Sequence, residues 1–133
     1  MPEPSTAPRP PGSADLSVVV AVRNAEAVLA QLFDRLYAVL DELGVRYEAV
    51  FVDDASRDRS ATLLRQQHRL RPDRTRVLFL SGGPDQQAAI AAGLTACVGR
   101  RVVILDAGPG GVPEEIPVLL AELERGHDLV VAR

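Results

Sequence analysis

Four aspartates stand at or just beyond points where apolar runs of the sequence end. Asp53 and Asp54 close the run YEAVFVDD, Asp106 closes RVVILD, and Asp85 follows RVLFL after a short polar stretch. Carboxylates at the ends of buried strands can accept hydrogen bonds from a base or a ribose, and they are hard oxygen ligands for divalent cations. Whether they act together depends on the elements that carry them.

Those elements alternate between apolar strands and amphipathic helices. Strands are predicted at residues 16–22, 47–54, 76–80, 101–106 and 128–132. Helices are predicted from 29 to 43, from 56 or 58 to about 69, from 85 to 98 and from 113 to about 125. This βαβαβαβαβ order predicts an α/β protein of three α-β-α layers around a mostly parallel, Rossmann-like sheet. Residues 1–14, rich in proline, serine and alanine, are expected to be a disordered tail, and residues 15–133 a single domain.

In such sheets, ligands bind beyond the carboxyl ends of the strands. The loops after the first four strands should therefore share one edge. If the strands are ordered third, second, first, fourth, Asp53 and Asp106 flank the first strand, where they could hold a base, a ribose hydroxyl or a divalent cation. Asp54 is expected to support the turn into the second helix. The alternative for Asp106 is a simple turn residue at the end of a strand.

Composition and missing motifs exclude several other classes. The 133 residues carry a net charge of -3, which argues against a nucleic-acid partner, and the apolar runs are too short to span a membrane. Neither G-x-G-x-x-G nor a P-loop is present. A receiver domain would need acids after the first and third strands and a lysine, and the sequence has no lysine. The single Cys97 suits the cytoplasm. Five arginines predict a solvated basic face, or alternatively a surface for acidic lipid or a partner: Arg65, Arg69, Arg71, Arg74 and Arg76.

Four segments together resemble the N-terminal half of family 2 glycosyltransferases. They are LSVVVAVRNAEAVLAQLFDRL, YEAVFVDDASRDRSATLL, VLFLSGGPDQQAAIAAGL and VVILDAGPGGVPEEIPVLLAELERGHDLVVAR. The resemblance covers nearly everything from Leu16 to Arg133 and is strongest to enzymes of the dolichol-phosphate mannose synthase type, which move a sugar from a nucleotide to a polyprenyl phosphate. It implies a truncated GT-A, nucleotide-diphospho-sugar-binding fold. It also implies a UDP- or GDP-sugar donor and a polyprenyl-phosphate or glycan acceptor.

The resemblance assigns donor-binding roles to six residues: Ala21, Arg23, Asn24, Asp53, Gln86 and Asp106. The stretch from Ala21 to Ala25 falls where the family has Pro-x-Tyr-Asn-Glu, and only Asn24 is retained. Asp53 matches the aspartate that accepts a hydrogen bond from the base, and Ala55 replaces the glycine that usually follows two residues later. The segment SGGPDQQ, which contains Gln86, matches a loop that usually reads Arg-Asn-x-Gly before Gln or Lys.

Asp106 matches the first aspartate of the family's metal-binding Asp-x-Asp pair, whose second aspartate is here Gly108. The resemblance implies Mg²⁺ or Mn²⁺, which stabilises the negative charge of the leaving diphosphate. With one carboxylate, Asp106 would bind the cation weakly, through the substrate's phosphates. Arg23 could supply positive charge near those phosphates, and Glu114 or Glu115 could turn toward the cation. The alternatives are a solvated arginine and an ordinary acid pair at a helix N-terminus.

The family's general base and acceptor pocket come from its C-terminal half, so no catalytic base can be named in these 133 residues. A chain that stops directly after a strand also indicates missing sequence. We expect a donor-binding domain with weak or absent turnover by itself, with the acceptor half supplied elsewhere or by a second chain. The alternative is an inactive nucleotide-binding or partner-binding domain, or a truncated remnant. The expected location is the cytoplasm, either free or peripheral at the inner face of the membrane.

Overall fold

A computed structural model describes residues 12–82, 87–108, 111–125 and 130–132. Within them, helices and strands alternate in the predicted order. The elements are β1 (Ala14–Val22), α1 (Glu26–Leu43), β2 (Tyr47–Asp54), α2 (Ser60–Leu70), β3 (Thr75–Leu80), α3 (Gln87–Ala96), β4 (Gly99–Asp106), the 3-10 turn η1 (Pro113–Glu115), α4 (Ile116–Glu124) and β5 (Val130–Ala132).

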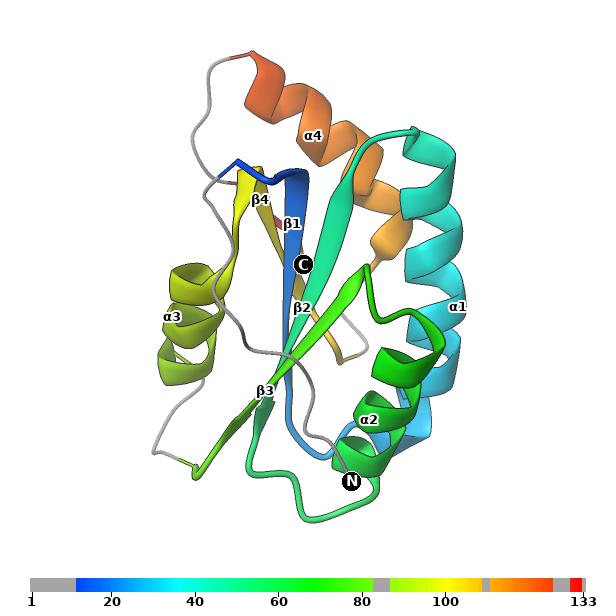
Figure 1. Ribbon diagram of the computed structural model, residues 1–133, viewed down its shortest axis with the longest axis vertical. Helices are drawn as coiled ribbons and strands as arrows, with labels where there is room; N and C mark the ends of the chain where they lie inside the picture. The colour runs from blue at the N-terminus through cyan, green and yellow to red at the C-terminus, as the bar shows by residue number, and fades with distance from the viewer. Residues whose placement is uncertain (1–11, 83–86, 109–110, 126–129, 133) are drawn as a thin grey trace.

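The five strands form one parallel sheet in the order β3-β2-β1-β4-β5. The predicted neighbours of the first four strands are confirmed, and β1 lies in the middle. Figure 1 shows α3 alone on one face of the sheet and α1, α2 and α4 on the other. Because both faces are covered, β1 is buried along most of its length, which explains its continuous run of valines. The three-layer α/β fold is therefore as predicted.

Successive residues of β1 point to opposite faces of the sheet. Val18, Val20 and Val22 pack into the larger core cluster with α1, α2 and α4, whereas Val19 and Ala21 pack into the smaller cluster with α3. α3 lies very close to the sheet, since a Cβ added at Gly93 would come within 2.4 Å of Cγ1 of Val19. This alternation decides on which side each acid at a strand end emerges.

Several boundaries differ from prediction for local reasons. β1 begins at Ala14, the last residue of the predicted tail, and that side chain is buried. The end of α1 does agree with the prediction: the helix ends at Leu43, and Gly44 caps it with a left-handed φ of 69°. The fourth helix opens as a 3-10 turn because Pro117 has no N–H for the carbonyl of Pro113, which accepts the N–H of Ile116 instead.

The arginines predicted to form a solvated basic face are mostly bound within the protein. Three guanidinium groups lie over aromatic rings: Arg65 over Phe79, Arg71 over Tyr37 and Arg74 over Tyr47. A fourth arginine, Arg76, is buried and lies 3.5 Å from the carboxylate of Glu48. The prediction is wrong for Arg76, which is buried, whereas the other three stay partly exposed with one side of the guanidinium against a ring.

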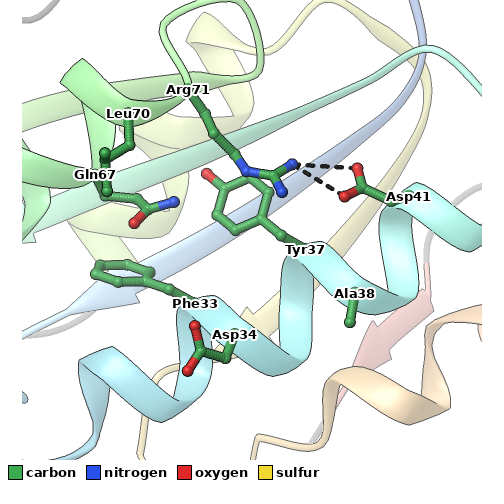
Figure 2. Close-up of a pocket in the computed structure, with 8 residues that line it drawn as sticks. All are labelled: Phe33, Asp34, Tyr37, Ala38, Asp41, Gln67, Leu70 and Arg71. Carbon is green, nitrogen blue, oxygen red and sulfur yellow. Dashed lines mark hydrogen bonds and ion pairs between the residues drawn. The ribbon is translucent and has the colours of Figure 1, made fainter.

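A hollow of about 510 Å³ lies between the second halves of α1 and α2 (Figure 2). Figure 2 shows the guanidinium of Arg71 at this hollow, reaching across from the end of α2 to Asp41 of α1, at 3.1 Å. Both helices begin at the carboxyl edge of the sheet, so this hollow lies toward the opposite edge. It is therefore separate from the acids at the strand ends. No helix in the described part of the chain is both long and apolar enough to cross a membrane.

Candidate functional site

Asp53 and Asp106 flank β1 at the carboxyl edge of the sheet. Asp53 is the register partner of Val22, and Asp106 is the partner of Ala21. The two acids lie on strands separated by β1, about 10 Å apart. Their partners in β1 are successive residues, which point to opposite faces of the sheet. Asp53 therefore emerges on the side of α1 and α2, and Asp106 on the side of α3. They can meet different parts of one ligand, but they cannot chelate the same ion, which binds oxygen at about 2.0–2.6 Å.

Asp53 is almost fully buried, at 4% exposure. Its Oδ1 accepts the hydroxyl hydrogen of Ser56 at 2.5 Å, and the Ser56 oxygen accepts the N–H of Asn24 at 2.9 Å. Burial raises the pKa of the Asp53 carboxyl above its ordinary 3.8, although the hydrogen bond from Ser56 opposes the shift. The carboxylate is thus held in a fixed position by its own loop.

Side chains bind the loop after β1 to the loop after β2. Three hydrogen bonds carry most of this contact: Arg57 N–H to Asn24 Oδ1 at 2.7 Å, Ala25 N–H to Ser60 Oγ at 2.9 Å, and Glu26 N–H to Asp58 Oδ2 at 3.0 Å. Asn24 has a φ of 49°, a left-handed conformation that asparagine tolerates. The two loops are therefore tied together by hydrogen bonds, and Asn24 takes part in two of them. The sequence analysis did not assign this bridging role to Ser56, Asp58 or Ser60.

Arg23 and Asp54 meet at the end of the central strands. An Arg23 nitrogen lies 3.7 Å from Oδ2 of Asp54; the arginine side chain is 56% exposed and the acid 4%. Asp54 was predicted to support the turn into α2, but at that turn it is Asp58 whose Oδ1 accepts the N–H of Ser60 at 2.9 Å. Oδ1 of Asp54 is buried and has no hydrogen-bond partner among the described residues. Its role is therefore linked to Arg23 rather than to the helix.

Asp106 is exposed, and its Oδ1 accepts the N–H of Gly108 at 2.9 Å. A Cβ added at Gly108 would lie 3.4 Å from Oδ1 of Asp106, an ordinary contact, and the backbone there is not left-handed. A side chain at the second position of the Asp-x-Asp pattern would therefore begin in van der Waals contact with the carboxylate of the first. Asp106 is left as a single carboxylate, with one oxygen already accepting a hydrogen bond.

One of the two other acids proposed as metal ligands, Glu114 rather than Glu115, is bound elsewhere. Glu114 accepts a hydrogen bond from Nε of Arg35 at 2.9 Å and a second one from Nη2, and this pairing lowers the pKa of its carboxyl. Within residues 12–82, 87–108 and 111–125, no group of three or more His, Cys, Asp or Glu side chains could hold a metal ion. Among the described residues, a cation at the Asp-x-Asp position would have the single carboxylate of Asp106 as its protein ligand and would depend on the phosphates of the ligand for the rest.

Two of the six predicted donor-binding residues are not among those seen at this edge of the sheet. Ala21 is buried, at 6% exposure, and packs against the α3 side of the sheet beneath the edge. Gln86 lies outside the described residues, as does Asp85. The structure thus brings together Arg23, Asn24, Asp53 and Asp106 at one edge of the sheet.

The loop after β2 contains a strained residue. Ala55 has a φ of 55°, in the left-handed region that glycine adopts without penalty. We predict that Ala55→Gly stabilises the protein by about 0.5–1 kcal/mol, because relief of strain exceeds the added freedom of the unfolded chain. Urea denaturation followed by circular dichroism measures the change. Ala38→Gly, inside α1, is the control and should destabilise. A lower midpoint for Ala55→Gly would contradict the prediction.

Solved glycosyltransferases share this arrangement of sheet and helices. The chain aligns with S. aureus TarS 1–349 with a TM-score of 0.62 at 21% identity, covering 85% of this chain and 33% of that chain. It also aligns with the mannosyltransferase PcManGT from Pyrobaculum calidifontis, in complex with GDP-Man and Mn²⁺. The TM-score is 0.54 at 25% identity, and the alignment covers 76% of this chain and 29% of that chain. The fold therefore defines a glycosyltransferase domain of the GT-A class.

The sequence comparison gives the family. The model of "Glycosyl transferase family 2" matches residues 17–133, and the chain belongs to that family. Curated relatives include undecaprenyl-phosphate 4-deoxy-4-formamido-L-arabinose transferases from Edwardsiella ictaluri, 39% identical over 86% of this chain, and Pseudomonas fluorescens, 42% identical over 86%. The chain spans about a third of the length of these relatives, 35% and 34%.

Proposed function

We propose that this chain binds the nucleoside diphosphate of a UDP- or GDP-sugar at the carboxyl edge of its sheet, as the donor-binding part of a sugar transferase. The observation that carries the proposal is the convergence of two rigidly joined loops and two acid-bearing strand ends around β1. Of the six residues that the sequence assigns to donor binding, Arg23, Asn24, Asp53 and Asp106 lie at this edge and carry the proposal, whereas Ala21 is buried beneath it and Gln86 lies outside the described residues. The GDP-Man bound by PcManGT and the names of the curated relatives support this ligand class.

In this proposal, Asp53 recognises the base. Uracil and guanine both present a ring N–H, which an ionised carboxylate accepts. The hydroxyl of Ser56 fixes one oxygen of Asp53, so the other is presented in one orientation. Since burial raises the pKa of this carboxyl, the acid takes up a proton at a higher pH than an ordinary aspartate. Nucleotide affinity should therefore fall in acid, beginning at a higher pH than it would for an aspartate with an ordinary pKa.

The acceptor of the sugar is proposed to be a polyprenyl phosphate, from the names of the relatives. None of the described residues is assigned as the general base, and we propose that base and acceptor pocket belong to a further part of the protein or to a second chain. Such a domain would turn over weakly or not at all by itself. It would work in the cytoplasm, peripherally at the inner face of the membrane when an acceptor lipid is engaged.

A second candidate is an inactive domain that retains nucleotide or partner binding. Gly108 favours it, because the Asp-x-Asp carboxylate that would help hold a cation is missing. Both candidates predict nucleotide binding, and they differ in turnover. Release of UDP or GDP from a sugar nucleotide, with a polyprenyl phosphate present, would favour the transferase. Binding without such release would favour the inactive domain.

Replacement of Asp53 tests the binding site. Calorimetric titration should show that UDP or GDP binds the natural chain and that Asp53→Ala weakens binding by about 10–100-fold, the value of a hydrogen bond to a charged group. Asp53→Asn should weaken binding and flatten the fall in affinity at acid pH. Asp73→Ala, on the exposed turn before β3, removes the same charge and should change neither the nucleotide affinity nor its dependence on pH. Unchanged affinity in Asp53→Ala, with the fold intact, would refute the assignment.

A further inference from the structure

Arg23 occupies a central place on the binding edge. It follows Val22 at the end of β1, the strand between β2 with Asp53 and β4 with Asp106. Its side chain is 56% exposed. The guanidinium is thus a positive group standing between the two acid-bearing strand ends and open to a ligand.

The alternation of β1 places Arg23 on the same side as Asp106. Val22 packs toward α1 and α2, so the next residue emerges on the α3 side, and the ion pair with Asp54 agrees with this. Asp54 and Asp106 stand two residues after Val52 and Ile104, which both pack in the α3 cluster, so both acids emerge on the α3 side. Arg23 also stands two residues beyond Ala21, the register partner of Asp106. The guanidinium and the single carboxylate of Asp106 therefore share one side of adjacent strands.

The present partner of Arg23 holds it loosely. At 3.7 Å, the nitrogen–oxygen separation to Asp54 is too long for a hydrogen bond, and an ion pair with one exposed partner contributes little. A guanidinium binds phosphate through two parallel hydrogen bonds, which are shorter and stronger. Asp54 is buried at the sheet edge, so this pairing keeps the arginine at the edge where the diphosphate is proposed to bind.

A diphosphate at this edge needs a positive partner. Asp53, Asp54 and Asp106 all lie at the carboxyl ends of β2 and β4, and their charges repel an anion. Gly108 supplies no carboxylate, so Asp106 is the single acid at the Asp-x-Asp position and contributes little to holding a divalent cation. We propose that Arg23 binds the diphosphate of the nucleotide and neutralises it, so that nucleotide binding by this chain is independent of divalent metal. The inference rests on the proposed function and specifies its charge partner.

Comparing nucleosides with their diphosphates in excess EDTA tests this role. UDP or GDP should bind at least about 10-fold tighter than uridine or guanosine, an increment that shrinks as salt rises. Arg23→Gln should remove most of that increment and leave nucleoside affinity unchanged. Arg23→Lys should retain part of the increment, since lysine keeps the positive charge but cannot form the two parallel hydrogen bonds of a guanidinium. Circular dichroism confirms the fold of each variant.

The matched control is Arg100→Gln. This exposed residue lies at the start of β4, at the opposite edge of the sheet from the proposed binding site, and the substitution changes the net charge equally. It should leave the diphosphate increment unchanged. The inference is overturned if Arg23→Gln keeps the increment, if Arg100→Gln loses it equally, or if the increment appears only with Mn²⁺. Failure of the natural chain to bind either nucleoside or diphosphate would refute the proposed function together with the inference. Binding of both that is unaffected by Arg23→Gln would refute the inference alone.

Discussion

Gly108→Asp should make nucleotide binding by this domain dependent on Mn²⁺. The added Cβ would lie 3.4 Å from Oδ1 and 3.6 Å from Oδ2 of Asp106, ordinary contact distances that start the second carboxylate beside the first. Two carboxylates together with the phosphates and water complete the oxygen ligands that a hard divalent cation requires. We expect UDP or GDP to bind about 10–100-fold tighter in Mn²⁺ than in EDTA, the range typical of changes around a metal site.

Isothermal titration with and without Mn²⁺ measures this effect, and two variants control it. Gly108→Asn has nearly the same size without the charge and should not respond to the cation. Asp106→Ala in the Gly108→Asp background should abolish the response. An equal response to Mn²⁺ in Gly108→Asn and Gly108→Asp would show that the carboxylate is not the ligand. A strong response in the natural chain would show that Asp106 suffices.

Glu48→Gln should destabilise the fold by about 3–5 kcal/mol, the value of breaking a buried ion pair by removing one partner. Glu48 is fully buried, and its Oε2 accepts the hydroxyl of Ser17 at 2.5 Å and the N–H of Val98 at 2.7 Å. Its other oxygen lies 3.5 Å from Nη1 of Arg76, which is 3% exposed. The substitution leaves that guanidinium buried without a counter-charge. Since domains are stable by only about 5–15 kcal/mol, the loss is a large fraction of the total.

Urea denaturation gives the free energy of unfolding for this variant and its controls. Asp15→Asn removes the exposed partner of Arg46 and should change the midpoint little. Glu48→Leu combined with Arg76→Met removes both buried charges and should recover part of the loss. A midpoint for Glu48→Gln that matches Asp15→Asn would mean that this buried pair does not stabilise the sheet.

Two departures from the family pattern act in the same direction at the proposed binding edge. Gly108 stands where a carboxylate would attract a cation, and Arg23 adds a positive charge at the end of the neighbouring strand, β1. Together they shift the balance of charge toward direct binding of an anion. The variants of Gly108 and Arg23 therefore test one question from opposite sides.

Much of this edge could be predicted from the order of residues because parallel strands all end at one side. The apolar runs ending at Asp53 and Asp106 are sufficient to place both acids beside β1 once the strand order is known. The bridging residues of the two loops could not be predicted, because Ser56 and Ser60 read as ordinary turn residues. Their partners, Asn24 and Ala25, are more than 30 positions away in the chain.

The sequence by itself determined the α/β class, the order of elements along the chain, the family and the absence of the second Asp-x-Asp carboxylate, whereas the strand order was only one possibility until the structure showed it. These follow from local patterns: hydrophobic period, turn residues and motif spacing. Only the tertiary structure decided that Asp53 and Asp106 emerge on opposite faces, that Glu114 is bound to Arg35, and that most of the basic cluster is packed against rings or buried. The physical reason is that the register of paired strands and the packing of distant helices set the direction and the partner of each side chain, and neither is written in the neighbouring residues.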